Sequence, residues 1–206
     1  MHYAWKLILK SAGILALLYI AGCVLVYFIQ ERLLFFPEKL PQDYTFRFNE
    51  PFEEHTIRAG DGTLLNGLLF RADTPRGLIF YLHGNAGGLN KWGELAATYM
   101  PLRYDVFMFD YRGYGKSGGA VKSELQFYED AQTAYDSVKK WYPENKITIL
   151  GYSIGTAAAA MLASKNNPQR LILQAPYYSL RDMAQHTYPY LPSFLLKYTF
   201  ATYRYV

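Results

Sequence analysis

The chain has 206 residues, of which 51% are hydrophobic, 17% aromatic and only 18% charged. This length suits one domain with a sizeable core, and the apolar fraction excludes a disordered protein. The single cysteine, Cys23, excludes a disulfide framework and a cysteine-ligated zinc site. The formal net charge is +4, but Lys6 and Lys10 lie in the first thirty residues, which hold no acidic residue. The remainder is therefore close to neutral, and we expect no nucleic-acid binding.

Residues 11–29 are the first predicted element, an apolar helix without a charged residue. At 1.5 Å rise per residue the stretch is about 28 Å long, close to the thickness of a bilayer's hydrocarbon core. Because Lys6 and Lys10 precede it, the positive-inside tendency places residues 1–10 in the cytoplasm. We therefore expect a single transmembrane anchor, with the rest of the chain on the outer (periplasmic or extracytoplasmic) side of the membrane.

This stretch has three other interpretations: a lipoprotein signal, a cleaved signal peptide and a buried core helix. The run Ile20-Ala21-Gly22-Cys23 resembles the lipobox of bacterial lipoproteins, in which the cysteine is lipidated. Residues 24–29 stay apolar, however, where a polar tether would be expected. The run is also too long for a cleaved signal peptide. The last alternative is a buried core helix. The leading interpretations, a transmembrane helix and a lipoprotein anchored at Cys23, both place the globular part on a membrane.

Prolines punctuate residues 30–52, which we interpret as an extended connector. Two strands follow at 53–59 and 63–71, around the hairpin signal Asp61-Gly62. Beyond them, short apolar strands alternate with helical stretches: strands at 78–82, 104–109, 146–150 and 171–173, and helices at 90–99, 122–142 and 154–164. This alternation predicts a mostly parallel sheet with helices on both faces. The spacing places one set of residues on the buried side of the longest helix: Leu125, Tyr128, Ala131, Ala134, Tyr135 and Val138.

The strongest chemical signal is Gly151-Tyr152-Ser153-Ile154-Gly155, between a predicted strand and an alanine-rich helix. A nucleophilic serine has to project from a sharp strand-to-helix turn. Gly151 and Gly155 lack the side chains that would block so tight a turn. The N-terminus of the helix also favours negative charge that develops near Ser153. We therefore predict that Ser153 is a nucleophile.

A second glycine-rich loop, His83-Gly84-Asn85-Ala86-Gly87-Gly88, follows the third predicted strand. Acyl transfer develops an oxyanion, and main-chain N–H groups held in place stabilise it. The expected donors are the N–H groups of Ile154 and Asn85. We expect His83 to be structural, holding the loop through its ring, with a role as catalytic base as the weaker alternative.

A third glycine-rich turn resembles nucleotide-binding motifs without meeting their requirements. Gly113, Gly115 and Gly118 satisfy G-x-G-x-x-G, but a dinucleotide fold carries that motif in its first strand-to-helix turn. The run from Gly115 to Ser117 matches the end of a Walker motif, yet Asp110 occupies the position of the required first glycine. We expect no nucleotide, no other cofactor and no metal.

Three motifs in this order, GLIFYLHGNAGG, FDYRGYGKSGG and ITILGYSIGTAAAA, resemble the α/β-hydrolase superfamily. The resemblance covers roughly residues 50–180 and is strongest to the membrane-anchored subgroup that includes Bem46 and alpha/beta-hydrolase domain proteins 13 and 17, which is serine aminopeptidase S33-like. It implies an α/β-hydrolase fold that is incomplete, with about six of eight strands. It also implies a nucleophile at Ser153, oxyanion contacts at Asn85 and Ile154, and ester, thioester, amide or peptide substrates.

The family's triad runs in the order serine, acid, histidine, and the last two members follow later strands. After Ser153 the only carboxylate is Asp182 and the only histidine is His186, and no predicted strand precedes either residue as the family requires. They are the weak candidates for acid and base.

We therefore expect a membrane-anchored serine hydrolase that is truncated at its C-terminus and lacks the acid and histidine of the triad. A catalytically inactive, hydrolase-like binding domain is the alternative. The expected division is a cytoplasmic N-terminus (1–10), an anchor (11–29), a connector (30–52), a hydrolase core (53–176) and the start of a lid (177–206).

Overall fold

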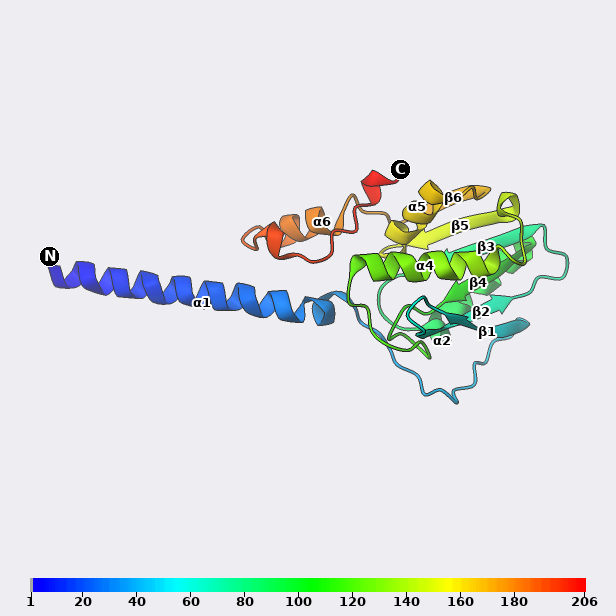
Figure 1. Cartoon of the computed structure of the whole chain (residues 1–206), viewed down its shortest axis with the longest axis horizontal. Coiled ribbons are helices and arrows are strands. Elements are labelled where there is room, and N and C mark those ends of the chain that lie inside the picture. Colours follow the sequence, from blue (N-terminus) through cyan, green and yellow to red (C-terminus); the bar gives the residue numbers. More distant parts are fainter. Residues whose placement is uncertain (1) are drawn as a thin grey trace.

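The computed structural model describes residues 2–206, with a six-stranded sheet, helices packed on it and one long N-terminal helix that projects away (Figure 1). The helices are α1 (His2–Leu34), α2 (Leu89–Trp92), α3 (Ala96–Tyr99), α4 (Glu124–Val138), α5 (Gly155–Lys165) and α6 (Leu180–Thr187). The strands are β1 (Phe52–Arg58), β2 (Leu64–Phe70), β3 (Gly77–Leu82), β4 (Tyr104–Phe109), β5 (Ile147–Tyr152) and β6 (Arg170–Gln174). Short 3₁₀ turns lie at Gly93–Leu95, Met100–Leu102, Glu144–Lys146, Ser193–Leu195 and Thr202–Arg204.

The sheet has the strand order β1-β2-β4-β3-β5-β6. β1 pairs with β2, and β2 with β4, in antiparallel fashion, whereas β4, β3, β5 and β6 are mutually parallel. The predicted hairpin closes as expected: Gly62 has φ +86° in its turn, and the Ala59 N–H donates to the Thr63 carbonyl at 2.8 Å. A positive φ of this kind suits glycine.

Alternate residues of the parallel strands face two separate cores, as the period of a strand requires. Leu78, Phe80 and Leu82 of β3 join the core that packs under α4 and α5. Ile79 and Tyr81 join the second core, which includes residues of α2 and α3. The prediction of a sheet covered by helices on both faces is therefore confirmed.

The predicted helices differ from the structure in two places. α4 starts after Ser123, whose hydroxyl accepts from the Gln126 N–H at 3.1 Å, and ends at Val138, within the predicted 122–142. Leu125 was predicted to be buried, but it is 65% exposed, whereas Phe127 is 1% exposed. The helix is rotated toward Phe127 because this ring packs against Tyr111 and Phe200. The predicted helix over 90–99 is interrupted by a 3₁₀ turn that starts at Gly93.

α1 is longer than the predicted apolar stretch and replaces the first residues of the predicted connector. An 18-residue window of α1 has a mean hydropathy of 2.5 and is 0% buried, so α1 is long and apolar enough to cross a membrane. The interpretation as a buried core helix is therefore wrong. Just after α1, Phe35 is buried against Phe127 of α4 and against Tyr198 and Phe200 near the C-terminus. These contacts join the end of α1 and the C-terminal region to α4.

Candidate active site

The parallel strands deliver the candidate residues to one edge of the sheet. Leu82 at the end of β3 pairs with Gly151 of β5, and Tyr81 pairs with Met108 of β4. The segments that follow these strands begin with His83, Asp110 and Ser153. In open α/β sheets, ligands bind outside the carboxyl ends of the strands, at the edge where these three residues lie.

Ser153 occupies the strained turn that the glycine pattern predicted. Its φ is +52°, a left-handed conformation that non-glycine residues rarely adopt. The Ser153 N–H donates to the carbonyl of Gln174 at 3.0 Å, and the Thr156 hydroxyl donates to the Ser153 carbonyl at 2.6 Å. These bonds hold the turn from both sides and leave the side chain of Ser153 half-buried at the start of α5.

The two flanking glycines are required by close backbone contacts. A Cβ on Gly155 would lie 2.2 Å from the carbonyl oxygen of Leu82 and 2.8 Å from that of His83. A Cβ on Gly151 would lie 2.6 Å from the carbonyl oxygen of Gly155. The serine turn therefore packs directly on the loop that follows β3.

Of the two residues predicted as oxyanion donors, Asn85 lies in this loop and Ile154 lies in the serine turn. Within residues 2–206, the main-chain N–H groups of Asn85 and Ile154 donate to no protein acceptor. Both residues flank the contact between the serine turn and the loop. Free N–H groups in this position are what an oxyanion would need. Tyr152 and Trp92, which sequence reasoning missed, pack against each other and over Gly84. The only signal in the sequence for these two residues is that each is a large aromatic residue within or just after a glycine-rich motif.

The side chain of Asn85 has a role that the sequence did not indicate. Its amide donates to the carbonyl of Leu34 at the end of α1, and its oxygen accepts from the Phe36 N–H at 3.3 Å and from the Tyr114 hydroxyl at 2.8 Å. The segment after α1, residues 35–40, is here called the strap. It continues along the same loop, with the Glu38 N–H donating to the Gly87 carbonyl at 3.0 Å.

The strap also covers the glycine-rich turn that resembled a nucleotide motif. The Gly115 N–H donates to the Glu38 carbonyl at 2.8 Å, and the Leu40 N–H donates to the Gly115 carbonyl at 2.9 Å. Gly115 has φ +47°, and a Cβ there would overlap the carboxylate of Asp110. The strap thus occupies main-chain groups of the turn and ties α1 to both glycine-rich loops.

His83 and Asp110 form a wholly buried pair beneath the loop. Their side chains lie 3.7 Å apart, too far for a hydrogen bond. Burial lowers the pKa of His83 to about 4 and raises the pKa of Asp110 to about 8, so both groups are neutral near pH 7. His83 Nδ1 lies 2.8 Å from the carbonyl oxygen of Gly84 and therefore carries the ring proton that it donates. Asp110 accepts from the Leu89 N–H at 3.0 Å.

The weak candidates for acid and base lie apart from this edge. Asp182 and His186 are on α6, where His186 Nδ1 is 2.9 Å from the main-chain carbonyl of Asp182. The side chain of His186 is 80% exposed. Within the described residues neither side chain forms a hydrogen bond to Ser153. His55, in β1, packs against Trp141 instead, with ring centroids 4.6 Å apart and the rings tilted by 43°.

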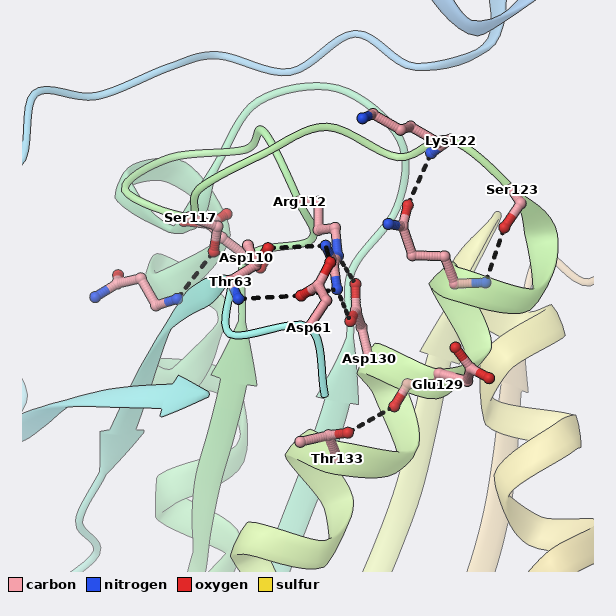
Figure 2. A network of polar contacts seen from close by, with 12 residues as sticks. Asp61, Thr63, Asp110, Arg112, Ser117, Lys122, Ser123, Glu129, Asp130 and Thr133 are labelled. Carbon is pink, nitrogen blue, oxygen red and sulfur yellow. Dashed lines mark hydrogen bonds and ion pairs between the residues drawn. The ribbon is translucent and has the colours of Figure 1, made fainter. Parts of the chain in front are cut away.

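A buried ion pair braces the turn beneath the site (Figure 2). Arg112 donates to Asp130 of α4 through Nε at 2.5 Å and Nη2 at 2.8 Å, and to Asp61 through Nη1 at 2.6 Å. Arg112 and Asp130 are buried, whereas Asp61 is half-exposed. The guanidinium holds the pKa of Asp61 below its usual range. The network fixes the glycine-rich turn to the β1–β2 hairpin and to α4.

Among residues 2–206 no three His, Cys, Asp or Glu side chains are grouped so that they could hold a metal ion.

Comparison with known proteins identifies relatives of this chain. Bem46 of Schizosaccharomyces pombe is 30% identical over 206 residues, covering 93% of this chain and 68% of bem46. The lysophosphatidylserine lipase ABHD12 of Gallus gallus is 36% identical over 129 residues, covering 57% of this chain and 34% of ABHD12. The chain thus spans about two thirds of one relative and about one third of the other.

A solved structure agrees with the fold. An esterase from Pyrococcus furiosus superimposes with a TM-score of 0.55 at 21% identity, covering 79% of this chain and 64% of the esterase. The predicted α/β-hydrolase fold is confirmed. A family model described as serine aminopeptidase, S33, matches residues 73–203, which include the loop after β3, the glycine-rich turn and the serine turn. On this match and the identity with bem46, the chain belongs to the serine aminopeptidase S33 family and is a Bem46-like α/β-hydrolase.

Proposed function

We propose that this protein is a membrane-anchored serine hydrolase that cleaves ester, thioester or amide bonds through an acyl-enzyme at Ser153. The observation that carries the proposal is the strained turn at Ser153, with φ +52°, packed directly on a loop with a free N–H at Asn85. Backbone strain of this kind persists where the surrounding contacts hold it, and it is concentrated at functional sites. Membership of a hydrolase family supports the same reaction class.

In the proposed reaction, Ser153 Oγ attacks the acyl carbon and loses its proton to a general base. The N–H groups of Asn85 and Ile154 stabilise the oxyanion of the tetrahedral intermediate. The leaving group departs with that proton, and an ester bond to Ser153 remains. Water then attacks the acyl-enzyme, which releases the carboxylic acid and restores the serine hydroxyl.

We further propose that the acid and the base of the triad are not among residues 2–206. His83 is buried and bonded to Gly84, His55 packs against Trp141, and His186 is exposed on α6. The described residues then supply the nucleophile and the oxyanion donors only. By analogy with triad deletions, this combination retains an acceleration of about 10³ to 10⁴ over water.

The membrane part of the proposal rests on α1. Its charge-free stretch would cross the bilayer with residues 1–10 in the cytoplasm and the hydrolase domain on the outer side. The division into anchor (11–29), connector, hydrolase core (53–176) and lid start (177–206) is part of the same proposal. One relative, ABHD12, is described as a lysophosphatidylserine lipase, which favours an acyl ester of a lipid as the substrate.

Labelling with a fluorophosphonate probe tests the catalytic part, because the rate of its reaction with a serine hydroxyl rises with the activation of that hydroxyl. We expect slow labelling that mass spectrometry locates at Ser153. Ser153→Ala should abolish it. Ser164→Ala is the matched control, since this exposed hydroxyl of α5 bonds to the Met161 carbonyl and lies outside the site. Labelling at another residue, or none above a denatured sample, would favour the inactive binding domain instead.

A further inference from the structure

Residues 183–196, here called the aromatic segment, form a largely exposed, charge-free stretch. It begins in the last part of α6, which ends at Thr187, and continues into the chain that follows. Between Asp182 and Lys197 the sequence holds no Asp, Glu, Lys or Arg. Three of its aromatic side chains project into solvent: Tyr188 is 64% exposed, Tyr190 is 86% exposed and Phe194 is 81% exposed. Exposed aromatic side chains gathered in one segment indicate a candidate interaction surface. We propose that the aromatic segment enters the bilayer leaflet that the C-terminal half of α1 crosses.

The first support is the position of the aromatic segment along α1. The Tyr19 hydroxyl donates to the carbonyl of Tyr190 at 2.6 Å, and Gln30 Nε2 donates to the carbonyl of Leu195 at 3.2 Å. Tyr19 lies within the charge-free stretch of α1, about 18 Å from Glu31 along the helix axis. α6 and the chain that follows it lie beside the C-terminal half of α1 in Figure 1. A bilayer that contains Tyr19 therefore contains Tyr190.

The second support is that the two charge-free stretches end at the same level. Glu31 is the first charge after the apolar stretch of α1, and Lys197 is the first after the aromatic segment. Lys197 Nζ lies 2.9 Å from Glu31 Oε1 and 4.7 Å from the centre of the Tyr27 ring. An ion pair next to a tyrosine ring is typical of the headgroup region. This pair marks where both stretches leave the hydrocarbon.

The third support is the way the backbone of the aromatic segment is bonded. In hydrocarbon, main-chain polar groups need partners within the protein. Pro189 and Pro192 carry no N–H, and the N–H groups of Leu191 and Leu195 donate to carbonyls within the segment at 3.0 Å each. The carbonyls of Tyr190 and Leu195 are the two that α1 bonds through side chains. The N–H groups of Tyr190, Ser193 and Phe194 have no partner among the described residues, so the segment meets this requirement only in part.

An apolar groove of about 360 Å³ separates α6 from α1 and completes the arrangement. Val26 and Leu33 of α1 line one wall, and Met183 and Leu191 line the other. The groove runs from Val26, within the charge-free stretch, to Leu33, just beyond Glu31, so a lipid acyl chain that enters from the headgroup level is the occupant that fits it. The proposal rests on the membrane part of the proposed function, since it needs α1 in a bilayer.

Depth-dependent quenching tests it on the full chain. In a Cys23→Ser background, single cysteines at Phe194, Leu25 and Leu102 are labelled with an environment-sensitive fluorophore, and the protein is reconstituted in vesicles of phosphatidylcholine and phosphatidylglycerol with doxyl-labelled lipid. Leu25 of α1 is the positive control, and Leu102, which is 55% exposed before β4, is the negative control. We expect blue-shifted, quenched emission at Phe194 and Leu25, and neither effect at Leu102.

The outcomes separate this inference from the proposal beneath it. Quenching at Leu25 without quenching at Phe194 overturns the inference and leaves the anchor intact. Absence of quenching at both positions overturns the anchor as well, and loss of vesicle association in the Cys23→Ser background assigns the anchor to a lipidated cysteine. Equal quenching at Leu102 shows association without a defined depth, which also contradicts the inference.

Discussion

The side-chain amide of Asn85 donates a hydrogen bond to the carbonyl of Leu34, the last residue of α1. The loop that would stabilise an oxyanion is thereby bonded to the end of the helix that would cross the membrane. The strap extends this connection, because its main chain pairs with Gly87 and then with Gly115. A change in the position of α1 should therefore change the conformation of the loop after β3, because hydrogen bonds connect the two.

Asn85→Ala should loosen this link. The substitution removes the bonds to Leu34, Phe36 and Tyr114, and we expect the free energy of unfolding to fall by about 1–3 kcal/mol. Hydrogen exchange of the full chain in detergent should show faster exchange of the Glu38 and Leu40 amides. Asn167→Ala is the control, since its exposed side chain lies outside the strap and forms no hydrogen bond among the described residues. Unchanged exchange in the strap of Asn85→Ala would contradict the link.

The buried pair predicts a specific pH dependence. The folded chain keeps the Asp110 proton up to about pH 8, whereas the unfolded chain releases it near 3.8, so stability falls as the pH rises through this window. In the folded chain His83 is protonated only below about pH 4, whereas in the unfolded chain it is protonated below about 6.5. The free energy of unfolding therefore falls as the pH drops through that window. Between about pH 4 and 6.5 the two effects oppose each other. Between about 6.5 and 8 only the effect of Asp110 remains.

Asp110→Asn isolates this effect, because an amide still accepts the bond from Leu89 and does not titrate. We expect the wild-type chain to lose up to about 1.4 kcal/mol per pH unit between pH 6.5 and 8 relative to Asp110→Asn. Urea titrations at closely spaced pH values measure the difference. Parallel curves for the two chains would show that Asp110 is already ionised in the folded protein.

The Arg112 network predicts how strongly the substitution of each nearby acidic residue lowers the free energy of unfolding. Asp130→Asn leaves a buried guanidinium without its main partner, so we expect a loss of about 3–5 kcal/mol. Asp61→Asn should cost less, because Asp61 is half-exposed and water replaces part of the interaction. Glu129→Gln, one residue before Asp130 on α4 and exposed, is the matched control and should have almost no effect. Equal losses for Asp61→Asn and Asp130→Asn would show that burial does not set the order.

The local patterns predicted the strands well because each strand is a short apolar run bounded by turn residues, as at 78–82 and 104–109. The serine turn was also predictable, since Gly151 and Gly155 flank Ser153 in the sequence itself. The strap was not predictable, because Leu34 and Asn85 meet only after the fold has formed and neither residue type demands the other. Leu125 was misplaced for a related reason: Phe127 rather than spacing decides which side of α4 is buried, through its contact with Phe200 near the far end of the chain.

The last prediction tests the proposal that the described residues lack the catalytic base. If Ser153 lacks only a proton acceptor, a small external base should replace it, because the side chain is half-buried rather than closed off from solvent. We expect imidazole to accelerate fluorophosphonate labelling of Ser153 in proportion to its concentration, and the acceleration to follow the neutral fraction of imidazole as the pH rises through the pKa of free imidazole. Ser153→Ala should show no labelling with or without imidazole, and a matched quaternary ammonium salt controls for ionic strength. His186→Ala should label at the unchanged slow rate and be rescued equally. Fast labelling without imidazole that disappears in His186→Ala would instead identify His186 as the base, reached by a movement of α6 toward Ser153.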